Sequence, residues 1–298
     1  MKTLTAKPET GCKCPICSGL SQPLFKKYGY LIWGCGSCGH QFINKFLNPE
    51  HIHHVYGDDY FQGGEAGYPD YLAESKLLNN HGRRYARMLR RHMPPGKVLD
   101  VGAAAGFVLQ GLVDYGWQGY GIEPNDRMAA YGRAQGLPIK TGSLEQLQSQ
   151  QQFDLITMIQ VIPHFFELHQ ALQTANTLTK PGGYWLIETW NRSSWTARML
   201  RHHWHEYSPP SVLHWFSPDG VLQLVNQYGF DEVARGRPQK WINAAHGKSL
   251  LSYKFKDMGV IGALGQQLMR LIPNELALPY LAEDLFWVLV RKRSLSRI

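Results

Sequence analysis

The 298-residue sequence lacks several features that would narrow its function at once. It has no uninterrupted run of about 18 apolar residues, so no membrane-spanning helix is expected, and its first residues form no apolar signal core. It also lacks the glycine-lysine-hydroxyl loop that holds polyphosphates and the G-x-G-x-x-G fingerprint of dinucleotide sites. We therefore expect a cytoplasmic protein whose ligand is neither a nucleoside triphosphate nor a dinucleotide.

Cysteine is scarce and confined to one segment. All five cysteines fall between residues 12 and 38, as two C-x2-C pairs with Cys12 just before the first pair. Two such turns facing each other across a hairpin present four thiolates at tetrahedral separation, which predicts a zinc ribbon with the ligands Cys14, Cys17, Cys35 and Cys38. Disulfides are the alternative, which a cytoplasmic location disfavours. A complete thiolate shell leaves no position for water, so this zinc is expected to be structural.

Charge is unbalanced towards basic residues. The sequence has 31 Lys and Arg against 23 Asp and Glu, a formal net charge of +8. Such a balance favours nucleic acid, an anionic membrane surface or an acidic substrate as a partner, whereas solvated helix faces are the simpler reading. The basic clusters are Arg83-Arg84, Arg90-Arg91, Arg235 with Arg237, and Arg291-Lys292-Arg293.

The stretch KVLDVGAAAGF at 97–107 joins an apolar strand to a turn of small residues. Small side chains at such a turn let the backbone approach a ligand closely. The next apolar stretch ends in Glu123, at a position where a carboxylate can accept hydrogen bonds from the hydroxyls of a ribose. These features predict a strand-turn-helix that binds adenosine without a polyphosphate.

Two further segments, FDLITMIQVIPHF at 153–165 and LTKPGGYWLIETW at 178–190, complete a pattern that resembles the class I S-adenosylmethionine-dependent methyltransferases. The resemblance is to the ubiquinone-type and sugar methyltransferases in particular. It implies an α/β fold, with a Rossmann-like seven-stranded methyltransferase sheet behind the zinc ribbon. The expected domains are a ribbon at 1–48, a linker and N-terminal helix covering the cofactor edge at 49–92, and a catalytic domain at 93–298 with insertions at 190–216 and 240–280.

Alternating apolar segments predict the elements of this domain. Strands are expected at 97–102, 119–123, 138–141, 153–159, 183–189, 230–236 and 285–292. Helices are expected at 71–92, 106–116, 126–135, 167–179 and 217–228, with Pro181-Gly182-Gly183 ending one helix before the fifth strand.

The resemblance also implies the residues of the S-adenosylmethionine site. Glu123 takes the ribose hydroxyls, Asp100 braces the turn or receives the ammonium group through water, and Ala104 stands where the family commonly has glycine. The cofactor residues implied are Tyr60, Asp100, Gly102, Ala104, Gly106, Glu123, Ser143, Leu144, Ile159 and Gln160.

The acceptor side is less defined. His164 is the expected general base, although Pro163 replaces the glutamate that often precedes this histidine in the family, and a packing role is the alternative. The segment 190–216 is dense in Trp and His, which predicts either substrate contacts or an ordinary helical cap. The substrate residues expected are Phe61, Trp204, His205, Tyr207 and His214.

Three functions stay open at this point. The favoured one is an enzyme that methylates, on oxygen, a small hydroxylated or phenolic metabolite, a sugar or a quinone-like lipid. The alternatives are a zinc-ribbon RNA methyltransferase and a non-catalytic cofactor-binding adaptor. Apolar residues at helical spacing within 240–280 predict a helix that packs in the core, forms a homodimer, covers the site or lies on a membrane surface.

Overall fold

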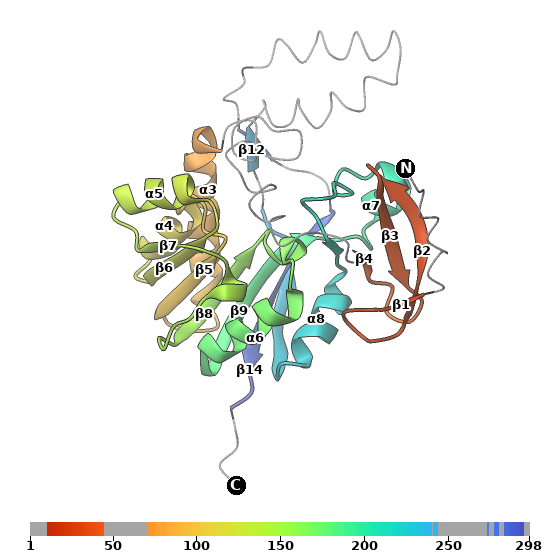
Figure 1. The fold of residues 1–298 in the computed structure, drawn as a ribbon. Coiled ribbons are helices and arrows are strands. Elements are labelled where there is room, and N and C mark those ends of the chain that lie inside the picture. The colour runs from red at the N-terminus through yellow and green to blue at the C-terminus, as the bar shows by residue number, and fades with distance from the viewer. Residues whose placement is uncertain are drawn as a thin grey trace, which may run out of the picture.

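The computed structural model describes residues 11–44, 71–239, 241–243, 273, 277–279 and 283–294. Figure 1 shows a large sheet with helices beside it and a small sheet formed by the N-terminal strands. Tyr60 and Phe61 lie outside the described residues, as does most of the segment 240–280 with its expected helix. The predictions made for those residues stay predictions.

The large sheet has seven strands in the order β11-β14-β9-β8-β5-β6-β7. Five of them are parallel, and β14 joins their edge antiparallel to β9 and pairs with β11. Their bounds are β5 Lys97–Val101, β6 Gln118–Glu123, β7 Ile139–Thr141, β8 Phe153–Ile159, β9 Thr179–Trp190, β11 Phe230–Gly236 and β14 Leu285–Lys292. This arrangement confirms the predicted Rossmann-like methyltransferase sheet.

Helices cover both faces of the sheet because its central strands are apolar on both sides. Leu155 packs into one buried cluster with residues of α3, α4 and α5, whereas Ile156 packs into another with residues of α6 and α8. The helices are α3 Ser75–Leu89, α4 Phe107–Val113, α5 Asp126–Ala134, α6 Leu168–Leu178 and α8 Pro218–Asn226. All ligand-facing loops consequently meet at the carboxyl ends of the parallel strands.

Two predicted boundaries differ from the structure. The helix expected at 71–92 starts as a short 3-10 turn, η1 Leu72–Glu74, and continues as α3. The Pro181–Gly183 segment does not precede the fifth strand but lies inside β9, as an irregularity between the residues that pair with Phe153 and Leu155. Gly182 has φ +75°, a conformation that glycine adopts without strain, so the chain bends there without leaving the sheet.

Helix α3 crosses α4 at two glycines. A Cβ on Gly82 would lie 2.1 Å from the carbonyl oxygen of Val108, and one on Gly111 would lie 2.3 Å from that of Asn79. This backbone-to-backbone contact leaves no room for a methyl group on either helix. It fixes the position of α3, whose inner face lines the site described below.

The N-terminal strands form an antiparallel sheet in the order β1-β2-β3-β4-β10. Its strands are β1 Cys12–Lys13, β2 Leu20–Lys27, β3 Tyr30–Cys35, β4 Gln41–Ile43 and β10 His214–Trp215. The last strand belongs to the segment 190–216, which also contains α7 Trp195–Leu200 and the 3-10 turn η4 Arg201–His203. The ribbon is therefore joined to the rest of the chain by a shared sheet.

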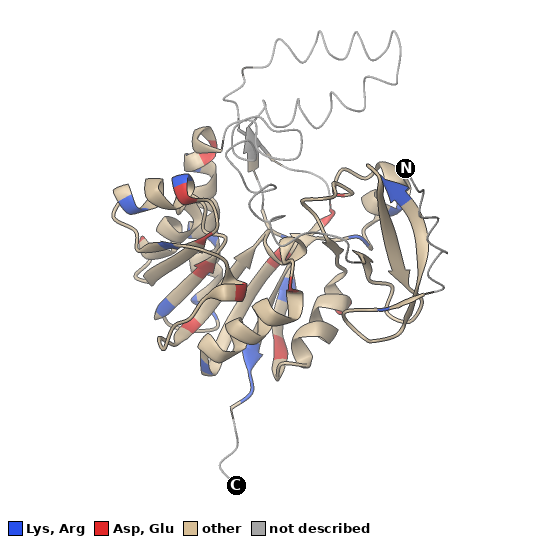
Figure 2. Ribbon diagram, viewed as in Figure 1, with Lys and Arg blue, Asp and Glu red and all other residues tan. Residues whose placement is uncertain are grey.

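Charged side chains are dispersed over the described part of the molecule, as Figure 2 shows. Several arginines of the predicted basic clusters form ion pairs, at 2.6 Å for Arg83 with Asp114, 2.9 Å for Arg235 with Asp219 and 2.6 Å for Arg293 with Asp231. Among the described residues, no helix combines the length and apolarity that crossing a bilayer requires.

Candidate active site

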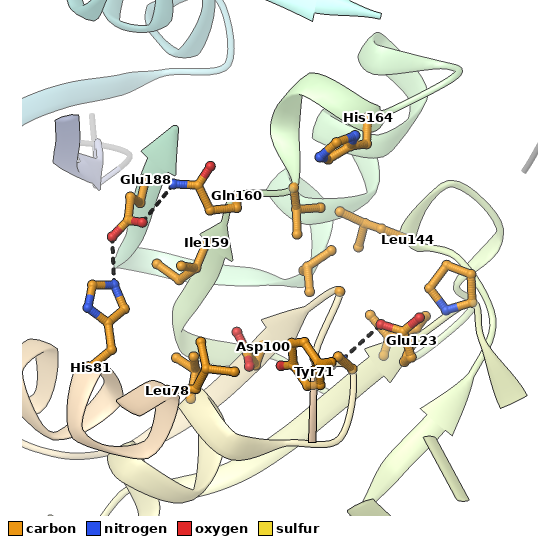
Figure 3. Close-up of a pocket in the computed structure, with 18 of the residues that line it drawn as sticks. Tyr71, Leu78, His81, Asp100, Glu123, Leu144, Ile159, Gln160, His164 and Glu188 are labelled. Carbon is orange, nitrogen blue, oxygen red and sulfur yellow. Dashed lines mark hydrogen bonds and ion pairs between the residues drawn. The ribbon is translucent and has the colours of Figure 1, made fainter. Parts of the chain in front are cut away.

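A pocket opens at the carboxyl ends of β5, β6, β8 and β9 and is covered on one side by α3. Figure 3 shows Glu123 and Leu144 at one end of it, Asp100 in the middle, and Gln160, Glu188 and His81 at the other end. Of the residues predicted to bind the cofactor, those in the lining are Asp100, Gly102, Ala104, Glu123, Ser143, Leu144, Ile159 and Gln160.

The floor of the pocket is the turn after β5. Gly102 has φ +65°, and a Cβ there would lie 2.5 Å from a methyl group of Val161. Ala104 has φ +46°, a left-handed conformation that costs an L-residue about 1–2 kcal/mol. A strained residue held in this way is typical of ligand sites.

Gly106 does not line the pocket. It precedes α4 with φ +80°, and a Cβ there would meet Leu137 at 2.4 Å and Ile139 at 2.9 Å. This glycine packs the turn against Leu137 and β7, and its predicted contact with the cofactor stays a prediction.

Glu123 ends β6 and is 4% exposed. Its Oε2 accepts a hydrogen bond from the amide of Ala104, and its Oε1 accepts one from the amide of Asn125, both at 2.8 Å. Burial raises the pKa of Glu123 to about 7, although the two amides lower it. Because a carboxylate has about four acceptor positions, two are left for hydroxyl groups in the pocket.

Asp100 lies beneath the same turn and is fully buried. Its Oδ1 accepts a hydrogen bond of 2.6 Å from the hydroxyl of Thr157 on β8, so the carboxyl ties two neighbouring strands together. Burial raises the pKa of Asp100 to about 7, against the effect of Thr157.

The end of the pocket next to Glu123 is lined by the residues after β7. Ser143, Leu144 and Glu145 all contribute to the lining, and η2 Leu144–Gln146 is a single 3-10 turn. Burial raises the pKa of Glu145, against several hydrogen bonds to the carboxylate. Glu145 is not among the cofactor residues predicted from the sequence, although it lines the pocket.

Gln160 and His164 follow β8. Gln160 has φ +60°, and its amide donates a 2.9 Å hydrogen bond to the carbonyl of Glu188. His164 ends η3 Ile162–His164, lines the pocket, and has Nδ1 2.7 Å from the carbonyl oxygen of Ser211. Burial lowers the pKa of His164, although the backbone of Ser211 and Gln160 raises it.

The far end of the pocket holds a cluster that the sequence interpretation missed. Glu188, on β9 and 1% exposed, lies 2.7 Å from Nε2 of His81 and accepts hydrogen bonds from Gln160 at 2.8 Å and from the Tyr85 hydroxyl. His81 and Tyr85 belong to α3, whose pocket face follows the helical repeat Glu74, Leu77, Leu78, His81, Arg84. Polar residues at helical spacing along this apolar face were the feature of the sequence that could have indicated the cluster.

The four substrate residues expected in 190–216 lie elsewhere. Trp204, Tyr207 and His214 are buried, and none of the four lines the pocket. Trp204 and Tyr207 pack with Ile32 and Trp215 against the ribbon, while His205 packs edge-on against Trp190. Trp204 and Tyr207 thus contribute to the contact between the ribbon and the rest of the chain, and the substrate contacts expected of these four residues stay a prediction.

The ribbon brings its four predicted ligands together. The Sγ atoms of Cys14, Cys17, Cys35 and Cys38 lie within 4.8 Å of one another, with 3.5 Å between Cys14 and Cys38 and 3.4 Å between Cys17 and Cys35. Tetrahedral zinc with Zn–S bonds of about 2.3 Å separates its sulfurs by roughly 3.8 Å. Burial raises the pKa of Cys35, but the amides of Cys38 and Ser37 and the thiols of Cys17 and Cys38 outweigh it and lower the pKa to about 6. Cys12 is not part of this cluster.

The fold and the pocket together define a Rossmann-like methyltransferase. A family model described as "Methyltransferase domain" matches residues 74–234, which is more than half of the chain. This chain belongs to that methyltransferase family, within the class I S-adenosylmethionine-dependent methyltransferases.

Among curated proteins, the chain is similar to ubiquinone biosynthesis O-methyltransferases. It is 22% identical to the one from Bradyrhizobium diazoefficiens over 154 residues, 45% of this chain and 60% of the relative. It is 27% identical to the one from Acinetobacter baumannii over 140 residues, 39% of this chain and 59% of the relative. The chain thus spans somewhat more than half the length of the curated relatives it matches.

Two solved structures have a similar fold. One is a possible histamine N-methyltransferase from Thermotoga maritima, with a TM-score of 0.51 and 20% identity over 82% of this chain and 99% of that one. The other is the 1,6-didemethyltoxoflavin N1-methyltransferase of Burkholderia thailandensis, with a TM-score of 0.51 and 12% identity over 92% of this chain and 100% of that one. At these identities the likeness concerns the fold alone.

Proposed function

We propose that this protein is an S-adenosylmethionine-dependent methyltransferase that methylates an oxygen of a small hydroxylated or phenolic molecule, a sugar or a quinone-like lipid. The observation that carries the proposal is the geometry around Glu123. A buried carboxylate at the end of β6, already aligned by two amides, faces a pocket whose floor is a left-handed turn of small residues. Similarity to O-methyltransferases supports oxygen as the acceptor atom.

The residues present fit the cofactor. We assign the ribose hydroxyls to Glu123, the adenine to the end with Ser143 and Leu144, and the methionine part to Gly102, Ala104 and the end of β8 at Ile159 and Gln160. A larger residue would not fit in place of Gly102, because a methyl group of Val161 already occupies the space that a Cβ would take. When bound, S-adenosylmethionine supplies an activated methyl group on sulfur, so the protein has mainly to place the acceptor in line.

His164 is proposed as the general base. In this role Nδ1 donates its hydrogen to the Ser211 carbonyl, the backbone of Gln160 also contacts the ring, and Nε2 is assigned as the nitrogen that takes the proton of the acceptor. A base at this position removes the proton that an acceptor hydroxyl must lose during transfer. The carbonyl of Ser211 holds the ring in one orientation throughout.

The test is methyl transfer from labelled S-adenosylmethionine to a panel of catechols, hydroxybenzoates and sugars by wild type and His164→Asn. Asparagine keeps a donor for the Ser211 carbonyl and removes the base, so turnover should fall roughly 10² to 10⁴-fold with cofactor affinity unchanged. The matched control is His169→Asn, on the exposed side of α6, which should act like wild type. Normal turnover by a folded His164→Asn protein would refute the assignment, and absence of cofactor binding by wild type would refute the proposed function.

We also propose that Cys14, Cys17, Cys35 and Cys38 hold one structural zinc. Four sulfurs complete a tetrahedral shell and leave no open position on the metal. The zinc would therefore stabilise the ribbon rather than take part in methyl transfer. Unpaired thiols that bind metal suit the reducing cytoplasm, which is the proposed location.

A further inference from the structure

Apart from Gln160, the cluster at the far end of the pocket takes no part in the mechanism proposed above. Glu188 is buried, and three side chains from two elements donate hydrogen bonds to it. Because Nε2 of His81 lies 2.7 Å from this carboxylate, Nε2 carries a proton and Nδ1 is left as an acceptor. Burying several polar groups together costs free energy unless they are hydrogen-bonded, so such a cluster is a candidate for a functional role.

Nδ1 of His81 lies 3.4 Å from a terminal nitrogen of Arg84. Glu188 thus orients the imidazole, and the imidazole orients the guanidinium. A guanidinium has five N–H donors, and this contact is the one hydrogen bond that Arg84 makes among the described residues. Its Nε is buried and without a partner there, and burial lowers the pKa of Arg84. The result is a cation in the pocket lining with most of its donors unused.

Arg84 lies far from the ribose end. Tyr71, which precedes α3, packs against Ala104 beside the turn that Glu123 holds. Thirteen residues separate Tyr71 from Arg84, about 20 Å along a helix. In the sheet, β9 with Glu188 is three strands from β6 with Glu123, about 14 Å. Figure 3 shows Glu188 and Glu123 at opposite ends of the pocket.

We infer that Arg84 is a carboxylate-binding residue of this pocket, with His81 and Glu188 as its positioning residues. The inference rests on the proposed function. An arginine with an unused planar fork matches a carboxylate through two parallel hydrogen bonds. The carboxylate belongs either to the acceptor, as in a hydroxybenzoate, or to the methionine part of the cofactor, and both sources lie beyond the ribose end of the pocket.

The experiment uses the full chain and calorimetry on wild type, Arg84→Gln and Arg84→Lys. The control is Arg87→Gln, an exposed arginine one turn further along α3. The first arm compares S-adenosylhomocysteine with 5′-methylthioadenosine, which lacks the amino acid part. The second arm titrates benzoate, and benzamide as its uncharged counterpart, into protein saturated with S-adenosylhomocysteine.

A loss of at least tenfold in benzoate affinity in Arg84→Gln, with S-adenosylhomocysteine binding retained, supports an acceptor carboxylate. A loss of at least tenfold for S-adenosylhomocysteine but not for methylthioadenosine supports the cofactor carboxylate. Arg84→Lys keeps the charge without the fork and should fall between. His81→Gln should weaken the same ligand while leaving methylthioadenosine unaffected.

The inference is overturned if Arg84→Gln, at an unchanged melting temperature, binds S-adenosylhomocysteine within threefold of wild type and benzoate binding is equally unchanged or undetectable in both. It is overturned too if benzamide binds as tightly as benzoate while Arg84→Gln binds S-adenosylhomocysteine as wild type does. Failure of wild type to bind either nucleoside would instead refute the proposed function, which the first arm reveals before any variant is compared.

Discussion

The proposed ribose contact predicts a specific pH dependence of cofactor binding. Glu123 has four acceptor positions when ionised, of which two are taken by the amides of Ala104 and Asn125. A proton on the carboxyl removes an acceptor that the ribose diol needs. Since the pKa of Glu123 in the ligand-free protein is raised to about 7, affinity should fall as the pH drops below 7.

The size of the effect follows from the ionised fraction. At pH 5.5 a group with a pKa of about 7 is roughly 3% ionised, so the apparent affinity for S-adenosylhomocysteine should be about 30-fold weaker than at pH 8.5. Binding below pH 7 should also release a proton, which calorimetry in buffers of different ionisation enthalpy detects. Asp100→Asn should move the midpoint to lower pH, because the charge of Asp100 contributes to raising the pKa of Glu123.

Glu123→Gln should remove the pH dependence and weaken binding at pH 8. The amide NH2 of glutamine cannot accept hydrogen bonds, so one backbone amide loses its partner and the diol loses acceptors. Two hydrogen bonds to a charged group, each about 1.5–3 kcal/mol, correspond to roughly 10² to 10⁴-fold in dissociation constant. Asp126→Asn, an exposed carboxylate on α5, is the control. A flat wild-type profile between pH 5.5 and 8.5, or a Glu123→Gln affinity within threefold of wild type, would remove Glu123 from the site.

The same carboxyl affects the ligand-free protein with the opposite sign. The folded state keeps its proton up to about pH 7, whereas the unfolded chain loses it near the ordinary value of 4.5. The unfolded state therefore binds fewer protons between these values, and the free energy of unfolding falls as the pH rises through this window, by on the order of 3 kcal/mol. Bound cofactor should offset this loss.

Two further predictions concern stability and metal. Cys14→Ser should lose zinc in metal analysis while Cys12→Ser keeps one equivalent per chain, and equal loss in both would mean that the ligand set is wrong. Gly111→Ala should lower the free energy of unfolding measured with urea by about 1–3 kcal/mol, because its methyl group would lie against the Asn79 carbonyl; a stability equal to that of wild type would contradict the tight helix crossing.

The sheet was predictable from the sequence because the alternation of apolar segments along the chain indicates where its strands begin and end. The strands 153–159, 230–236 and 285–292 were expected with the bounds that the structure shows. The motif around Asp100, Gly102 and Glu123 is local, so a short stretch of sequence places these residues in one pocket. The cysteine pattern is also local, because each C-x2-C pair lies within one short turn.

What could not be predicted depends on contacts between distant parts of the chain. Glu188 looks like one polar residue in an apolar strand, and its partner His81 lies 107 residues away on α3. The Trp and His residues of 190–216 suggested a pocket by composition alone. The burial of Trp204 and Trp215 with Ile32 depends on the pairing of β4 with β10, which no periodicity within either segment encodes.

That pairing also connects the ribbon to the proposed base. The amide of Ile43, at the end of β4, donates a 3.0 Å hydrogen bond to the carbonyl of Leu213, and the amide of Leu213 donates one of 2.9 Å to the carbonyl of Pro163. Two residues before Leu213, the carbonyl of Ser211 accepts the hydrogen bond from His164. The segment with Ser211 and Leu213 thus holds the backbone around His164, and the ribbon sheet holds that segment. A ribbon that loses its fold would free this segment, so its geometry bears on turnover even though no described ribbon residue lines the pocket.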